Sequence, residues 1–281
     1  MKIIDLNFQN TQNIIASFLI EAKEPILIET GPESTFKHLT YKLKELGLNI
    51  NDIRHVFVTH IHLDHSGAAW CFAKTNAKIY VHPAGAKHLI DPFRLVASAQ
   101  IVYKDKLKTL FGNIMPIDKD KVVILDDQKE INIAGTKILP IFTPGHAKHH
   151  ACFFVNDHMF VGDAGGIRIL DGPIMPPMPP PDINLKEWIA SIEKLKKYKP
   201  NFVCPTHFGC YTADNHFDKL ISHIIQYEIF IKNSQDYNQF LKFIDTFFYD
   251  KSIREHYKLA NPDDMNFEGL LRYFKIFINQ N

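Results

Sequence analysis

Three histidines and one aspartate lie together in the segment His60-Ile61-His62-Leu63-Asp64-His65. Imidazole nitrogens and carboxylate oxygens are the ligands that zinc, iron and manganese take in proteins. On a turn, the side chains at i and i+2 can face one side, while those at i+4 and i+5 face another. This arrangement suits two adjacent metal ions better than one. A solvated surface loop is the alternative, but four such residues at this spacing favour a metal site.

The segments on either side of this cluster predict how the chain positions it. Residues 54–58 are apolar and rich in β-branched or aromatic side chains, which is typical of a buried strand. Residues 66–70 begin with small side chains that suit a tight entry into a helix. We therefore expect the cluster on a loop at the exit of a strand.

The pattern Thr-His-x-His-x-Asp-His at residues 59–65 resembles the signature of the metallo-β-lactamase superfamily, in its glyoxalase II-like form with two metals. The resemblance implies three further ligands downstream: a histidine, a bridging aspartate and a last histidine. Each is present in that order after an apolar run that predicts a strand: His146 in Thr-Pro-Gly-His, Asp163 in Gly-Asp, and His207 in Pro-Thr-His. Within the superfamily, the details resemble a group of uncharacterised prokaryotic hydrolases.

The resemblance also divides the seven residues between two divalent metal ions, for which zinc is favoured and iron and manganese stay open. One ion takes three histidines, the other takes two histidines and an aspartate, and a second aspartate bridges them. The first set is His60, His62 and His146, the second is Asp64, His65 and His207, and the bridge is Asp163. Asp64 has a further implied role as the catalytic residue that orients the bridging water and passes a proton to the leaving group.

This ligand set predicts an enzyme, a metal-dependent hydrolase. Two adjacent cations lower the pKa of a shared water, and the resulting metal-bridging hydroxide attacks an ester-like bond in a thioester, a lactone or a similar substrate. An iron-dependent oxidoreductase similar to persulfide dioxygenases is the alternative, although the Gly-Arg-Thr-Asp stretch expected there after the bridging acid is absent. A non-catalytic module is disfavoured, because structural sites close their coordination.

The expected fold class is α+β. The resemblance implies a four-layer αββα sandwich for residues 1–212. The pattern then changes to helical spacing, which predicts a helical appendage at 213–281 that packs on the sandwich and covers the site or forms a homodimer contact. Apolar runs predict strands at 14–20, 25–28, 54–58, 77–82, 122–125, 130–133, 136–142, 151–155, 159–161 and 202–204. Helical spacing predicts helices at 34–49, 84–90, 91–110 and 185–199, and three more in the appendage, at 215–231, 238–249 and 266–277.

Composition limits the partners. The chain has 281 residues, of which 46% are hydrophobic, and a net charge of +1 that gives no reason to expect nucleic acid. Neither a signal peptide nor an apolar run of about 20 residues is present, so no membrane is expected. The four cysteines lack CxxC spacing and fit a reducing cytoplasm better than a disulfide framework. A small-molecule substrate is the expected partner, and a homodimer stays open.

Several features near the cluster have open roles. Similar proteins carry Asp-Thr-Gly where this chain has Glu29-Thr-Gly, with the acid behind the metal histidines; a capping acid at a strand end is the other interpretation. Residues 173–181 contain six prolines and form either a surface connector or a pocket wall. Residues 91–121 are expected to lie over the cluster and shape the pocket. His150 is expected to support the site or to pack, and His149 stays open.

Overall fold

Two six-stranded sheets form the centre of the structure, a computed structural model that describes residues 1–279. The first sheet has the order β1 (Lys2–Asp5), β2 (Ala16–Ile20), β3 (Ile26–Ile28), β4 (His55–Phe57), β5 (Lys78–Val81), β6 (Val122–Ile124). The second has the order β12 (Tyr211–Thr212), β11 (Phe202–Cys204), β10 (His158–Phe160), β9 (Ala151–Val155), β8 (Thr136–Phe142), β7 (Ile131–Ile133).

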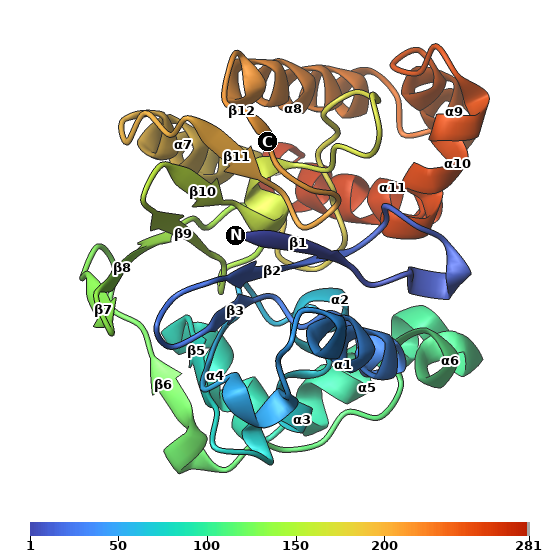
Figure 1. The fold of residues 1–281 in the computed structure, drawn as a ribbon. Coiled ribbons are helices and arrows are strands. Elements are labelled where there is room, and N and C mark those ends of the chain that lie inside the picture. The colour runs from blue at the N-terminus through green and yellow to red at the C-terminus, as the bar shows by residue number, and fades with distance from the viewer. Residues whose placement is uncertain (280–281) are drawn as a thin grey trace.

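Helices cover the outer faces of both sheets. Those after the first sheet's strands are α1 (Phe36–Glu45), α2 (Leu63–Ser66), α3 (Ala69–Ala73), α4 (Pro83–Ile90), α5 (Phe93–Tyr103) and α6 (Leu107–Phe111). Those that follow the second sheet's strands are α7 (Leu185–Lys196), α8 (His216–Asn233), α9 (Tyr237–Asp245), α10 (Lys251–Ala260) and α11 (Asp263–Tyr273). In Figure 1, α1, α3 and α4 lie below β2 and β3, and α7 and α8 lie above β9 and β10. The αββα sandwich is confirmed.

Alternating side chains explain why the sheets pack face to face. In β2, Phe18 points into an apolar cluster shared with the second sheet, while Leu19 belongs to the core under the helices. The Phe18 ring contacts that of Phe160 edge-on, with centroids 5.2 Å apart, and Phe57 meets Phe153 in the same way. Such aromatic pairs bind two layers together in a defined register.

The strand directions bring the ends of several strands to one edge of the sandwich. β4 runs parallel to both β3 and β5 in the first sheet, and β10 runs parallel to β11 in the second. Parallel neighbours end at the same edge of a sheet, so the loops that leave them lie close together. All candidate ligands follow β4, β8, β10 or β11.

The structure departs from the sequence-based expectations at several points. β1, the two-residue β12 and helix α10 have no counterpart in them, and the expected loop at Leu63–Ser66 is the short helix α2. Cys204 and Cys210 form a disulfide, where free thiols were expected. The chain turns back from β11 into the antiparallel β12, which brings the two Cα atoms to 4.1 Å.

The C-terminal helices pack against α7 and against the segment that joins β10 to β11. The Tyr257 hydroxyl accepts a hydrogen bond from Ile169 N at 3.0 Å, and Asn266 Oδ1 accepts one from Met178 N at 2.8 Å. Leu220 of α8 is buried in the same apolar core as Trp188 of α7. A domain boundary at residue 212 stays a prediction. Among residues 1–279, no helix is long and apolar enough to cross a membrane.

Candidate metal centre

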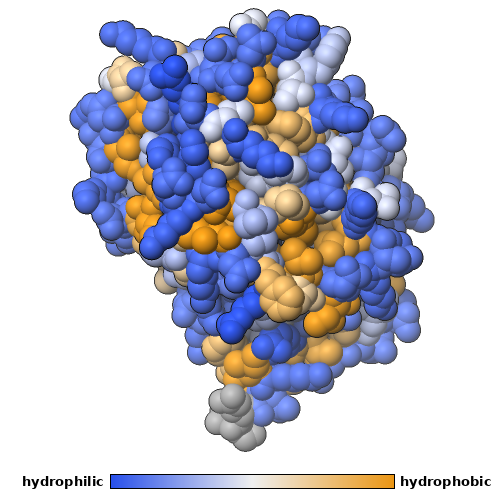
Figure 2. Space-filling view, turned by 90° about the horizontal axis from the view of Figure 1, so that it is seen from below, coloured by the Kyte–Doolittle hydropathy of each residue, from blue (hydrophilic) through white to orange (hydrophobic). Residues whose placement is uncertain are grey.

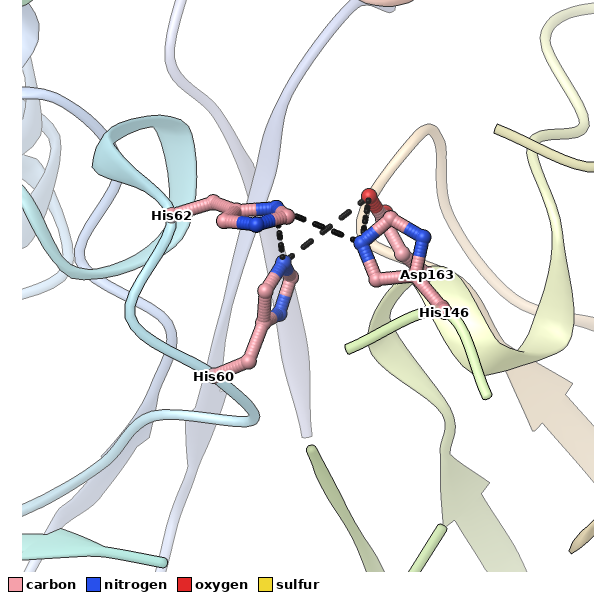
Figure 3. A group of neighbouring side chains, drawn as sticks. All are labelled: His60, His62, His146 and Asp163. Atoms are coloured by element: carbon pink, nitrogen blue, oxygen red, sulfur yellow. Dashed lines mark hydrogen bonds and ion pairs between the residues drawn. The ribbon is translucent and has the colours of Figure 1, made fainter. Parts of the chain in front are cut away.

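The structure brings the seven predicted residues together at the sheet edge, in two groups. His60, His62, His146 and Asp163 form one group, and Asp64, His65 and His207 form the other; within each group the candidate ligand atoms lie within 4.8 Å of one another. His60 and His62 belong to the loop after β4, whereas Asp64 and His65 lie in α2. Figure 3 shows the first group, with the two residues of the β4 loop facing His146 and Asp163, which follow β8 and β10 of the second sheet.

Asp163 lies between the two groups and presents one oxygen to each. Its Oδ2 is 3.3 Å from His146 Nε2 and 3.9 Å from His60 Nε2. Its Oδ1 is 3.3 Å from His65 Nε2 and 3.7 Å from His207 Nε2. A carboxylate placed in this way has the geometry of a bridge between two cations.

In three of the five histidines the nitrogen that faces the groups is available as a ligand, because the opposite ring nitrogen is already hydrogen bonded. His146 Nδ1 donates to the carbonyl of Pro177 at 3.0 Å, and His207 Nδ1 donates to the carbonyl of Ile14 at 2.7 Å. His60 Nδ1 hydrogen bonds with the Thr59 hydroxyl at 3.0 Å. Fixing the outer nitrogen sets the tautomer and aims the lone pair of Nε2 inward, as in known metal sites.

Buried polar atoms that lack hydrogen-bond partners indicate whether the two groups could hold cations. His65 Nε2, His207 Nε2 and Asp163 Oδ1 are buried and make no hydrogen bond within the described residues. Unpaired buried polar atoms are costly, and these converge on one point. Imidazole and carboxylate donors in this arrangement fit two divalent transition-metal ions, whose identity the donor set does not fix.

Glu29 lies behind the second group. Its Oε1 accepts hydrogen bonds from Thr59 N at 3.2 Å and from the Thr206 hydroxyl at 3.5 Å, and it is 3.5 Å from His65 Nδ1. The side chain is fully buried. Glu29 therefore supports three residues next to or within the site, which favours the supporting role over a strand-end cap.

The turn that carries Asp163 is fixed from three sides. His150 Nε2 accepts a hydrogen bond from Ala164 N at 3.2 Å, and Trp188 Nε1 donates one to Ala164 O at 2.8 Å. His216 Nε2 donates to Gly165 O at 2.8 Å. His150 also pairs with the Thr143 hydroxyl through Nδ1, so both of its nitrogens are used and it supports the site from outside.

The conformation of the Thr-Pro-Gly-His segment requires a glycine at position 145. Its φ of +135° is rare for residues with a side chain, and a Cβ atom there would lie 2.2 Å from the Cα of Trp188. The missing side chain lets the loop after β8 approach α7 closely. This approach places His146 beside Asp163.

Burial and charge set different protonation in the two groups. Burial lowers the pKa of His62 to about 3, with a further contribution from His146, and burial lowers the pKa of His60 as well. Burial acts in the same direction on His65, but the charges of Asp163, Asp64 and Glu29 outweigh it and raise its pKa. Neutral imidazoles in the first group are ready to bind a cation at neutral pH.

A cavity of about 680 Å³ opens above the two groups. His62, Asp64 and Asp163 line it at the site. Helix α5 and prolines of the 173–181 segment form walls, as does the junction of α10 and α11. Of the segment 91–121, residues 94–103 therefore shape the pocket, and the proline segment is a pocket wall. His149 also lines the cavity.

No sequence pattern pointed to Tyr103, the last residue of α5. It lines the cavity, and its hydroxyl makes one described hydrogen bond, to Met265 Sδ at 3.7 Å. Burial raises the pKa of Tyr103, with Asp64 and Asp163 adding to the effect. The hydroxyl therefore stays protonated above the site. Only the folded structure reveals that Tyr103 lies at the cavity, because an aromatic residue at a helix end belongs to no sequence motif.

Sequence comparison finds relatives across most of the chain. A metallo-beta-lactamase fold-containing protein of Sulfurisphaera tokodaii is 26% identical over 71% of this chain and 76% of its own length. A probable metallo-hydrolase of Methanocaldococcus jannaschii is 28% identical over 66% of this chain and 85% of its own. A hydroxyacylglutathione hydrolase of Salmonella paratyphi A is 28% identical, but only over 42% of this chain and 37% of its own.

Solved structures share the fold over nearly the whole length, the C-terminal helices included. A metallo-beta-lactamase family protein of Thermus thermophilus has a TM-score of 0.73 at 19% identity, covering 97% of this chain and 91% of its own. An archaeal superfamily protein of Sulfolobus tokodaii has a TM-score of 0.70 at 22% identity, covering 96% and 97%. The sequence model of the family described as metallo-beta-lactamase superfamily matches residues 10–207, which hold all seven candidate ligands. The chain belongs to the metallo-beta-lactamase superfamily.

Proposed function

We propose that the protein is a hydrolase that holds two divalent metal ions, with zinc favoured, and cleaves an ester-like bond in a thioester, a lactone or a related ester. One observation carries the proposal: Asp163 presents one oxygen to each ligand group, while Asp64, His62 and Asp163 also line a cavity of about 680 Å³. A site that opens on a cavity of this size has room for a substrate, whereas structural sites are closed.

The residues would divide the work as follows. His60, His62, His146 and Asp163 would hold one cation, and Asp64, His65, His207 and Asp163 the other. Bound there, two cations would supply hydroxide at neutral pH and polarise the substrate carbonyl. The carboxylate of Asp64 would accept a proton from the attacking water and return it to the leaving group.

The surroundings of Asp64 keep its carboxylate ionised and place it at the cavity. Its Oδ2 is 3.3 Å from His207 Nε2 and 3.7 Å from His65 Nε2, and its side chain is about one fifth exposed, toward the cavity. Burial raises the pKa of Asp64, but the His65 charge and the His207 hydrogen bond outweigh this and lower it to about 2. The group is thus ionised over the physiological range and is in reach of a bound substrate.

The comparisons support the reaction class at a coarser level. The relatives of Sulfurisphaera tokodaii and Methanocaldococcus jannaschii are described by fold and as a probable metallo-hydrolase, and neither name specifies a substrate. The name of the Salmonella relative, hydroxyacylglutathione hydrolase, favours hydrolysis at an acyl group. The alternative, an iron-dependent oxidoreductase, would use one metal ion, which does not account for the second ligand group.

Metal analysis combined with a substrate screen tests the proposal. The purified protein should contain two metal ions per chain and turn over at least one member of a panel of thioesters, lactones, phosphodiesters and β-lactams. His146→Ala should lower the content toward one ion and abolish turnover, whereas His256→Ala, at a partly exposed position on α10, should change neither. One iron per chain together with oxygen consumption would establish the oxidoreductase instead.

A further inference from the structure

The walls of the cavity above the ligand groups differ from its floor in chemistry. The wall residues are mostly apolar and come from α5, from the proline segment and from the α10–α11 junction. They include Leu95, Ala99, Val102, Pro177, Pro179 and Met265. Prolines have no backbone N–H to offer, so the proline segment presents few hydrogen-bond donors to a substrate. The walls therefore favour an apolar group.

The apolar wall continues outward along α5. Ala99 is buried at the base of the wall, whereas Ile101 lines the cavity and is 77% exposed. Seen from below, the largely hydrophilic surface is interrupted by patches of apolar side chains (Figure 2). An extended chain bound along α5 would stay in contact with apolar atoms from the site to the surface.

Two arginines stand at the rim of the same cavity. Arg94 lies near the N-terminal end of α5 and Arg272 near the C-terminal end of α11; both are exposed and line the cavity. Neither makes an ion pair with any residue in the described chain, although Arg272 Nε donates to the carbonyl of Pro181 at 3.2 Å. Asp182 is the nearby rim acid, and Lys148 lies 3.6 Å from it. The rim thus carries unbalanced positive charge.

We propose that the substrate is amphiphilic: an ester or thioester with an extended apolar acyl chain along α5 and an anionic group held at the rim by Arg94 and Arg272. This inference rests on the proposed hydrolase and names the substrate class for the same site. Apolar area removed from water provides affinity in proportion to chain length. Guanidinium groups suit carboxylate and phosphate, which they bind through paired N–H donors.

Two series of thioesters test the chain and the anion separately. One series carries the anionic thiol 3-mercaptopropionate and the other the neutral thiol N-acetylcysteamine, each with acetyl to decanoyl chains. With the metal-loaded enzyme, kcat/KM should rise at least about 100-fold from acetyl to octanoyl, because each buried methylene contributes up to about fourfold. The anionic series should exceed the neutral one by about fivefold. A flat chain-length profile, or equal rates for both thiols, would overturn the inference.

Wall and rim variants assign these preferences to residues. Ala99→Leu and Ser98→Leu should lower the ratio of octanoyl to acetyl kcat/KM by about tenfold, whereas Ala97→Leu, on the exposed side of α5, should not. Arg94→Gln and Arg272→Gln should remove the preference for the anionic thiol, and Arg54→Gln, an exposed arginine away from the cavity, should keep it. Metal content and circular dichroism must match the parent in every variant.

A binding probe separates this inference from the proposed reaction. 1-Anilinonaphthalene-8-sulfonate combines an apolar aromatic body with a sulfonate, and it should bind the metal-loaded parent and be displaced by decanoate. Ala99→Leu and Arg272→Gln should each raise its dissociation constant at least about fivefold. If no ester-like compound is turned over, the proposed reaction fails, and the probe then decides the ligand class. Equal binding to parent and variants, or no binding, would overturn it.

Discussion

The floor and the walls of the cavity come from different parts of the fold. The floor is the ligand cluster, which sits at the ends of strands from both sheets; His60, His65 and His146 are fully buried there. The walls come from helices and a proline segment outside the sheets, and several of their residues are exposed, Arg94 and Ile101 among them. The cavity is thus bounded by the strand ends on one side and by peripheral helices and the proline segment on the other.

This difference separates the residues expected to act in the reaction from those expected to select the substrate. Floor residues are held by hydrogen bonds such as those from His146 to Pro177 and from His207 to Ile14, which fix their orientation. Wall residues contact their surroundings mostly through apolar packing. Substitutions there should therefore change the shape of the cavity more readily than the chemistry at the ligand groups. Floor variants should therefore alter metal content and turnover of every substrate, and wall variants should alter preference among substrates.

The strongest test of the floor is Asp163→Asn. The substitution replaces a carboxylate whose two oxygens serve both groups, so both cations should be lost together. The combined metal affinity should fall by more than about 10⁴-fold, since even outer partners of a metal ligand contribute about 10- to 100-fold for each ion. Metal analysis after dialysis measures this. Asp126→Asn, an exposed acid just after β6, is the control, and retention of both ions in Asp163→Asn would contradict the bridge.

Asp64→Asn separates a ligand role from a proton role within the floor. An amide oxygen can still coordinate, so excess metal should restore occupancy. The rate should nevertheless stay about 10²- to 10⁴-fold below the parent, because general acid–base assistance is lost. kcat and metal occupancy are measured on the same sample. A rate within about threefold of the parent at full occupancy, too small for such assistance, would leave Asp64 a ligand only.

Arg254→Met tests how the wall is supported. Arg254 is 5% exposed; its Nη2 donates to Asp263 Oδ1 at 2.8 Å and Oδ2 at 2.7 Å, which joins α10 to α11 beside the cavity. Leaving the mostly buried carboxylate of Asp263 without its partner should cost about 3 kcal/mol of unfolding free energy. Chemical denaturation measures the loss, with Lys251→Met as the exposed control on the same helix.

The same variant has a predicted pH dependence. Burial already raises the pKa of Asp263, and Arg254 partly offsets this. Without the arginine the folded-state pKa should rise further, so the folded state binds a proton more readily than the unfolded state. The stability deficit should therefore shrink as the pH falls through that pKa. A deficit that stays constant with pH would show that lost packing, rather than a buried charge, causes it.

The floor was predictable from sequence because its chemistry lies in short motifs. His60 to His65 fall within one turn, and His146, Asp163 and His207 each follow an apolar strand, so spacing and strand exits were enough to expect them together. The αββα sandwich followed from the same resemblance. The structure does bring all seven residues to one edge, in the two groups that were expected.

The walls were not predictable to the same degree, because they depend on packing between distant segments. Tyr103 meets Met265 across 162 positions of sequence, and no local pattern records such a contact. Helix α10 was not foreseen because its face toward the protein is formed by few apolar residues, Ile253 and Tyr257 among them. The disulfide between Cys204 and Cys210 depends on the antiparallel return into β12, a strand too short to show periodicity.

Glu29→Gln tests the support beneath the floor. Glu29 Oε1 lies 3.5 Å from His65 Nδ1 and also accepts from Thr59 N, so the change should weaken the affinity for the cation that His65 would hold about 10- to 100-fold. Titration with a chelator should show one weakened ion and one that is nearly unchanged. Glu21→Gln, an exposed acid in the turn between β2 and β3, serves as the control. Equal retention of both ions would make Glu29 a structural residue only.

Tyr103→Phe is the smallest change and falls on the boundary between floor and wall. Tyr103 lines the cavity, and its hydroxyl donates to Met265 Sδ, a weak acceptor that a substrate oxygen could replace. Losing one neutral hydrogen bond should lower kcat/KM by about 2- to 10-fold. Metal content should stay at the parental value, and Tyr41→Phe, at an exposed tyrosine, should change nothing. Unchanged kcat/KM with a substrate that fills the cavity would place the hydroxyl outside recognition. Loss of metal from the variant would instead assign Tyr103 to the floor, because only floor residues should affect the ions.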